Sequence, residues 1–364
     1  MKKSLLALAA LTAFAGVASA QSSVTLFGVI DANVRNVKTS AGSLKTLSTD
    51  GMGSSRLGLR GVEDIGGGLR AGFWLEGSVN VDVGGGQKAP YAGITLPTGT
   101  NSAVGNTYSG QDWQRRATVS LLGGFGEIRL GRDYTPDFWN HTVFDPFGTN
   151  GVGNSVNTFD TLGSGASTTV RANNSVGYFL PGGLGGVYGQ VMVAAGEGAT
   201  GNKHMGFRVG YAAGPMNVAL AYGKTSVDGS VDWTRLNIGA SYNLGFMTLM
   251  GQYINSDVSG GAANGRENTN IVLGANIKAG AQGTFKVSYV KADGDGPAAS
   301  DKTRDATQMA FGYQHALSKR SSVYAHYARI SNKAGANYRV AGTALANAAG
   351  KASTGFEFGV NHSF

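Results

Sequence analysis

Side chains alternate between apolar and polar or small along almost the whole chain after residue 20. Val24, Leu26 and Val34 share one parity, opposite Thr25 and Asp31. A period of two is the pattern of a β-strand whose two faces meet different surroundings. About sixteen such segments follow one another, near 24-37, 55-63, 69-82, 113-122, 127-134, 171-180, 187-196, 204-213, 216-228, 233-243, 246-257, 268-279, 284-293, 306-316, 321-332 and 354-364.

The connections between these segments differ in length. Short ones lie at 64-68, 123-126, 181-186, 214-215, 244-245, 280-283 and 317-320, and long ones at 38-54, 83-112, 135-170 and 333-353. Short periplasmic turns and long external loops are typical of outer-membrane barrels with an even number of strands. Closure leaves no strand edge with unpaired backbone groups in lipid. We therefore expect an all-β fold, a 16-stranded antiparallel transmembrane β-barrel.

Two other architectures fit the chain less well. No stretch after residue 20 approaches 18 consecutive apolar residues, which argues against helical membrane spans. A soluble, secreted β-sandwich would alternate similarly, but about sixteen strands would make two domains, and no linker is evident. Glycine is 59 of 364 residues, about twice the usual share of roughly 7%. Turns and a curved sheet account for many of these glycines.

The first twenty residues have the organisation of a secretory signal peptide. Lys2 and Lys3 precede an apolar run, and Ala18-Ser19-Ala20 forms an A-x-A cleavage site. The apolar run from residue 5 to residue 17 is shorter than the roughly 20 residues of a membrane-spanning helix. We expect 1-20 to be a signal peptide and 21-364 to be the exported barrel. Cysteine is absent, so the exported chain has no disulfide and no thiolate metal site.

The charge of the chain does not indicate nucleic-acid binding. Its formal net charge is +8. A basic chain can bind nucleic acid, but the lysines and arginines form no run and are spread singly along the alternating segments. We expect no nucleic-acid partner.

Catalytic motifs are equally weak. Gly66-x-Gly68-x-x-Ala71 imitates a dinucleotide fingerprint but opens a strand, not a helix, and Gly223-Lys224-Thr225 lacks the first glycine of a phosphate-binding loop. The histidines form no metal-binding pair at a spacing of two or four; they are His141, His204, His315, His326 and His362. We expect no cofactor, no metal and no enzymatic activity, with a barrel phospholipase as the alternative.

Several segments, in order along the chain, resemble the trimeric general porins of Gram-negative bacteria, in particular their anion-selective β-proteobacterial branch. These segments are QSSVTLFGVIDANV, SSRLGLRGVEDIGGGLRAGFWLEG, RRATVSLLGGFGEIRLGRDYTP, RANNSVGY, HALSKRSSVYAHYA and the final phenylalanine. The resemblance implies a homotrimer of sixteen-stranded barrels whose third external loop folds inward. That loop would be 135-170, with Asp145 to Gly148 near its inward tip.

Strand parity places several arginines in the lumen. If Leu57 and Leu59 face lipid, Arg56 and Arg60 face inward. The same rule places Arg70 in the lumen, and we treat Arg60 and Arg70 as secondary lumen sites. Arginine suits a pore because it stays charged and offers a weakly hydrated planar fork to anions.

The resemblance assigns a basic cluster at the constriction to Arg56, to one residue of the pair Arg115 and Arg116, and to Arg171. Parity favours Arg116: if Val119 and Leu121 face lipid, Arg116 faces the lumen. A strand end can twist, so both residues of the pair remain candidates. The alternative for each arginine is that it only pairs with a carboxylate inside a polar barrel.

Carboxylates are expected across the gap from these arginines. Glu76 has lumen parity and Asp145 lies in the loop, so the two would form an acidic counterface and set up a field across the pore. Asp133, Asp137 and Asp160 lie near or within the loop at undetermined positions. If several of them line the constriction, the preference for anions weakens or reverses.

The sequence thus predicts an outer-membrane general diffusion porin that passes small hydrophilic solutes and prefers small anions. Substrate-specific channels for an organic acid or phosphate, and a non-conducting barrel adhesin, are the alternatives. Expected partners are the homotrimer, outer-membrane lipid and lipopolysaccharide. The last strand, which ends in Phe364, resembles the segment that the outer-membrane assembly machinery recognises.

Overall fold

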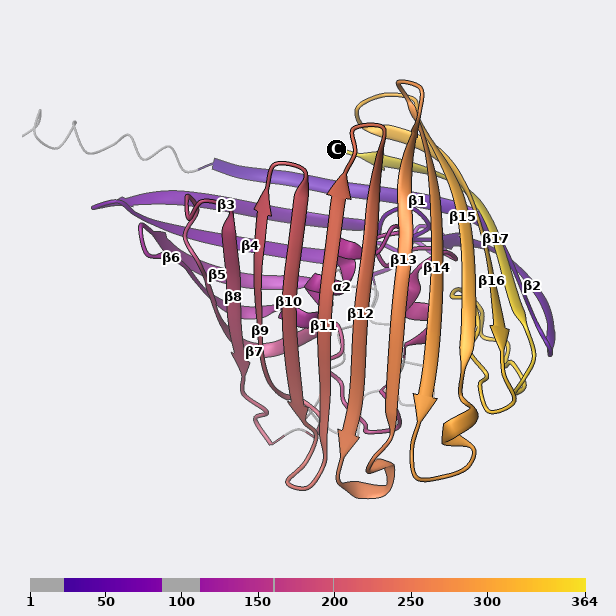
Figure 1. Ribbon diagram of the computed structural model, residues 1–364. Helices are drawn as coiled ribbons and strands as arrows, with labels where there is room; N and C mark the ends of the chain where they lie inside the picture. The colour runs from indigo at the N-terminus through magenta and orange to yellow at the C-terminus, as the bar shows by residue number, and fades with distance from the viewer. Residues whose placement is uncertain (1–22, 87–111, 160, 199) are drawn as a thin grey trace, which may run out of the picture.

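The chain forms one antiparallel sheet that closes on itself (Figure 1). The computed structural model describes residues 23–86, 112–159, 161–198 and 200–364. Closure is made by the first and last strands, which pair from Val29 with Ser363 to Lys38 with Thr354. The predicted signal peptide and most of the connection 83-112 lie outside the described residues.

The named elements are almost all strands. They are β1 (Ser23–Thr39), β2 (Gly42–Thr49), β3 (Arg56–Gly66), β4 (Leu69–Ser78), β5 (Arg116–Gly123), β6 (Gly126–Tyr134), α2 (Pro136–Phe144), η1 (Ser155–Thr158), β7 (Arg171–Phe179), β8 (Val187–Ala194), β9 (Lys203–Ala213), β10 (Met216–Ser226), β11 (Asp232–Asn243), β12 (Met247–Ser259), η2 (Gly261–Ala263), β13 (Glu267–Ala279), β14 (Gly283–Asp295), η3 (Asp301–Thr303), β15 (Ala306–Ala316), β16 (Ser321–Asn332) and β17 (Ser353–Ser363). The predicted short turns join β3 to β4, β5 to β6, and so on to β15 and β16, all at the same end of the barrel.

Seventeen named strands make a sixteen-stranded barrel because β2 and β3 share one position. One half of β1 pairs with β2, and its other half pairs with β3. The expected long connection 38-54 was therefore wrong: the chain turns at residues 40–41 and returns as β2. Leu44 pairs with Val37 and Leu47 with Val34, so the two leucines have opposite parity. That mixed pattern conceals a strand from an alternation test.

Large apolar side chains point outward and polar ones point inward. Leu26 is 58% exposed and Val119 54%, whereas Asp31 and Glu357 are fully buried. This arrangement is the reverse of a soluble protein and suits a barrel with lipid outside and a polar interior. Within the described residues, no helix combines the length and the apolar character needed to cross a membrane.

The long loop 135-170 folds into the barrel, as predicted. Figure 1 shows its helix α2 behind strands β10–β12. The Asn140 amide donates to Asn237 Oδ1 at 2.9 Å, and Asp137 pairs with Arg235 at 3.1 Å, which fixes the helix to β11. Further along the loop, the backbone N–H of Val152 donates to Glu357 Oε1 at 3.1 Å, on β17. The loop is thus fastened to two different walls.

Candidate pore constriction

A basic wall faces the lumen from strands β3 to β6. The sheet register places Arg60 opposite Trp74, and Glu76 opposite Arg116. Residues directly opposite in an antiparallel pair project from the same face, so all four side chains point inward. Because parity alone sets this direction, the sequence predicted it for Arg56, Arg60, Arg116 and Glu76.

Glu76 is the acidic centre of this wall. Its Oε1 accepts from Arg115 Nε at 2.6 Å and lies 3.9 Å from Arg56 Nε, while its Oε2 accepts from Trp74 Nε1 at 3.1 Å. Arg115 also donates to the Tyr134 hydroxyl at 3.2 Å. Both arginines of the Arg115–Arg116 pair therefore reach the lumen wall, since Arg115 precedes β5 and escapes the alternation of that strand.

Arg116 is held less tightly. Its guanidinium lies 4.5 Å from the centre of the Trp74 ring, and its Nε donates to Thr118 Oγ1 at 3.1 Å. The nearest carboxylate, Asp133, is 3.8 Å away and also pairs with Arg129. The loose contact with Asp133 leaves Arg116 with positive charge that a mobile anion can use.

A space of 500 Å³ separates the wall from the inward loop. Four arginines line it, namely Arg56, Arg60, Arg115 and Arg116, against the two carboxylates Glu76 and Asp133. The described loop residues on the opposite side are uncharged: Trp139, Thr142, Gly148, Thr149 and Asn150. Carboxylates and arginines thus share one wall, and the wall carries an excess of positive charge.

Arg171 joins this cluster indirectly. Its Nη2 donates to the Tyr134 hydroxyl at 2.6 Å, and its guanidinium lies 4.1 Å from the centre of the same ring. Tyr134 therefore stands between Arg171 and the space, which Arg171 does not line. Tyr134 could not be predicted as a site residue, since a tyrosine at the end of a strand carries no distinctive signal.

Asp145 does not form the expected acidic counterface. It is 3% exposed and accepts from the backbone N–H groups of Phe147, Thr149 and Ser155 at 2.9, 3.2 and 3.0 Å, and from the Ser155 hydroxyl at 2.8 Å. Burial raises the pKa of its carboxyl above the ordinary range, although these hydrogen bonds oppose the shift. Asp145 organises the loop from within because its neighbours in sequence turn their backbone donors toward it.

Of the remaining predicted residues, only some lie at the constriction. Arg70 is exposed near the start of β4 and does not line the space. Asp133 lies on the wall, whereas Asp137 is buried beside Arg235. Asp160 lies outside the described residues. Arg129 was missed, although its place between Ile128 and Leu130 carries the same parity signal as Arg56.

Other lumen side chains hold the loop. Arg235 is 1% exposed and pairs with Asp137, and Arg208 donates to Asn140 Oδ1 at 2.8 Å. Glu357 accepts from the loop's Val152 N–H and is itself paired with Arg35 at 2.8 Å. Among the residues that the structure describes, no group of three or more His, Asp or Glu side chains could hold a metal ion.

The barrel and its inward loop have counterparts among known proteins. The model of the Gram-negative porin family matches residues 7–361. This chain belongs to that family. Outer membrane porin protein 32 of Delftia acidovorans is 37% identical over 381 residues, covering 100% of both chains. An outer membrane porin protein of Bordetella pertussis is 28% identical over 393 residues, covering 91% of this chain and 95% of its own.

A solved structure shows the same architecture. The anion-selective porin from Comamonas acidovorans superimposes with a TM-score of 0.80 at 35% identity, covering 94% of this porin and 100% of its own chain. The predicted family, barrel fold and outer-membrane location are thus confirmed. Its relatives are channels rather than enzymes.

Proposed function

We propose that this porin is a general diffusion channel that passes small hydrophilic solutes and favours anions. One observation carries the proposal: among the described residues, four arginines and only two carboxylates line the constriction, and the loop residues opposite them are uncharged. Low-dielectric barrel walls concentrate the field of an unbalanced charge in a narrow aqueous gap. That field lowers the barrier for anions and raises it for cations. The anion-selective relative has the same fold and supports the proposal.

The site favours passage over tight binding. Glu76 holds Arg115 and lies near Arg56, so part of the positive charge is already neutralised. The space of 500 Å³ is larger than a small hydrated anion needs. An anion therefore meets several partial charges in succession, and conduction requires that each contact be weak enough to release it.

We further propose, from the family resemblance, that the barrels form a homotrimer in contact with outer-membrane lipid and lipopolysaccharide. Phe364 is proposed to be read by the outer-membrane assembly machinery. The side chain of Phe364 packs over Gly28, where a Cβ would lie 2.3 Å from the ring. Its backbone N–H and carbonyl both bond to Gly28 at 3.0 Å. The C-terminal residue thus has a defined seat at the seam where the barrel closes.

The test is the zero-current potential across a planar bilayer in a KCl gradient. We expect a sign that shows chloride to be more permeant than potassium, and the same sign for Arg320→Ala, which removes an exposed cation from a short turn. A potential of the opposite sign would overturn the proposed anion preference. Saturation by a single solute would indicate a substrate-specific channel, and a folded oligomer without conductance would indicate an adhesin or a lipase.

A further inference from the structure

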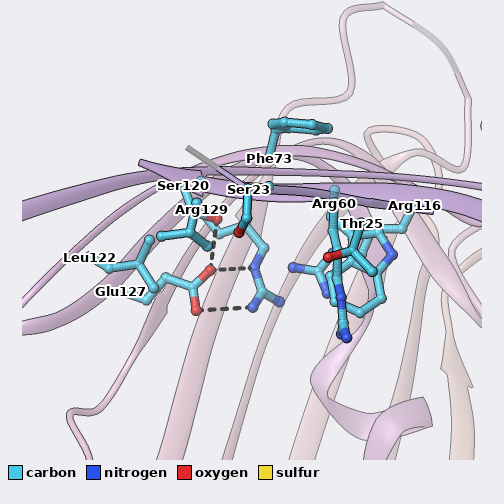
Figure 2. Close-up of a pocket in the computed structure, with 13 residues that line it drawn as sticks. Ser23, Thr25, Arg60, Phe73, Arg116, Ser120, Leu122, Glu127 and Arg129 are labelled. Carbon is cyan, nitrogen blue, oxygen red and sulfur yellow. Dashed lines mark hydrogen bonds and ion pairs between the residues drawn. The ribbon is translucent and has the colours of Figure 1, made fainter. Parts of the chain in front are cut away.

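A second cavity lies on the same wall, toward the end with the short turns. Its volume is 370 Å³, within the range of roughly 300–1,000 Å³ of small-molecule sites. Strands β1 and β3 to β6 line it, and Figure 2 shows the Glu127–Arg129 pair on one side and Arg60 with Arg116 on the other. From this cavity we infer that the porin has a binding site for aromatic carboxylates, an inference that rests on the proposed anion channel.

Two of the cations in the cavity are only weakly paired: Arg116 lies 3.8 Å from Asp133, which pairs more closely with Arg129. The side chain of Arg60 forms no ion pair or hydrogen bond within the described part of the chain. Its guanidinium lies 5.1 Å from the centre of the Trp74 ring, and that of Arg116 lies 4.5 Å from the same ring. Two like charges are thus gathered around one indole. A bound anion would relieve their mutual repulsion.

The acidic residue of the cavity is already occupied. Glu127 accepts from Arg129 Nε at 2.8 Å and Nη2 at 3.1 Å, and from the Ser120 hydroxyl at 2.7 Å. These contacts form a two-pronged pair, the geometry in which arginine neutralises a carboxylate most completely. Glu127 is therefore paired mainly with Arg129, and Arg60, Arg116 and Arg129 together leave the cavity with an excess of positive charge.

Aromatic rings flank the guanidinium groups. Arg60 also lies 5.3 Å from the centre of the Phe27 ring. A stacked guanidinium keeps the N–H donors at its edge free, so it can grip a carboxylate with two parallel hydrogen bonds. Thr25 and Ser23 add hydroxyl groups to the same lining.

The other part of the lining is apolar. Val62, Leu122 and the indole of Trp74 contribute to it, and Gly72 lies opposite Val62 in the register without a side chain to fill the space. A ligand that matches both parts has a carboxylate at one end and a flat apolar body at the other. An aromatic monocarboxylate such as benzoate has this form, whereas acetate or inorganic phosphate matches only the basic part.

The experiment compares two probes in planar bilayers. Sodium benzoate or sodium acetate is added at pH 7.5 to porin carrying a KCl current, from each side in turn. We expect benzoate to block at about a tenfold lower concentration than acetate, because its ring is removed from water. Arg60→Gln should raise the half-blocking benzoate concentration about tenfold. Arg320→Gln should leave it unchanged.

Leu122→Ser tests the apolar part separately. It should raise the half-blocking concentration of benzoate and leave that of acetate unchanged. Equal block of the wild type by benzoate and acetate, in a channel that prefers chloride, would overturn the aromatic site and leave the proposed function intact. A wild-type channel that does not prefer chloride would instead overturn the proposed function. The wild-type comparison and Leu122→Ser decide the question even if Arg60→Gln does not fold.

Discussion

Arginines that point into the barrel differ in exposure between two sides of its wall. On the wall of β3 to β6, the side chain of Arg56 is 31% exposed and that of Arg116 18%. Under the loop, Arg235 on β11 is 1% exposed. Parity decides that a side chain points inward, but the course of the loop decides whether it meets water or protein.

The loop makes this difference because it is fastened to only part of the barrel. Helix α2 contacts strands β8 to β12, with most of these contacts on β9 to β11. The later part of the loop bonds to Glu357 on β17. Within the part of the chain that the structure describes, the loop leaves strands β3 to β6 uncovered across the space, so arginines that line it are available to solutes. The covered arginines anchor the loop, and we propose that the uncovered ones set selectivity.

Breaking an anchor should have the largest effect on stability. Asp137→Ala leaves Arg235 buried without its carboxylate, which typically costs about 3–5 kcal/mol. We expect a marked fall in the thermal unfolding temperature measured by circular dichroism in detergent. The matched change on the wall, Arg56→Ala, removes a half-exposed contact of 3.9 Å and should cost about 1 kcal/mol or less. Equal unfolding temperatures for the two variants would contradict the distinction.

Removing the uncovered charges should have the largest effect on selectivity. Arg56→Gln combined with Arg116→Gln takes two of the four arginines from the constriction. We expect the chloride-to-potassium permeability ratio to fall about tenfold, since each charge acts across a narrow space of intermediate dielectric. Zero-current potentials in a KCl gradient measure the ratio. A ratio equal to that of the wild type would show that these arginines do not select ions.

Neutralising the acidic centre of the wall should act in the opposite direction and more weakly. Glu76→Gln keeps a hydrogen-bond acceptor for Arg115 but removes the negative charge near Arg115 and Arg56. We expect the permeability ratio to rise about twofold in favour of chloride. A shift toward potassium in the same measurement would mean that Glu76 acts mainly by positioning Arg115.

The smallest effect is expected at Asp145. Asp145→Asn removes a charge that lies inside the loop and is 3% exposed. The zero-current potential should therefore stay at the wild-type value. A shift toward chloride as large as that of Glu76→Gln would place Asp145 at the pore surface after all.

The sequence predicted the features that depend on local alternation. Arg56, Arg60 and Glu76 follow from a period of two, and their register across β3 and β4 then brings them together. The prediction that Asp145 faces the pore was wrong. That residue is buried among backbone donors of its own loop, and no periodic pattern in the sequence records this arrangement.

The residues that anchor the loop, and the bridging Tyr134, could not be predicted from the sequence for a related reason. Arg235 meets Asp137 only because the loop crosses the lumen, with 97 residues between the two partners in the chain. Tyr134 bridges Arg115 and Arg171 from the end of β6. Such contacts depend on the path of an irregular segment, and alternation contains no information about that path.

The central claim is that uncovered arginines of the β3–β6 wall give the channel its anion preference. The chain has no cysteine, so Arg56→Cys and Arg235→Cys each carry a single thiol. Each variant is treated in the bilayer with positively or negatively charged thiol reagents while the zero-current potential is recorded. We predict that at position 56 the positive reagent restores chloride preference and the negative reagent lowers it further, whereas position 235 does not react until the barrel is unfolded. Rapid reaction at position 235, or a potential at position 56 that ignores the sign of the reagent, would contradict the account.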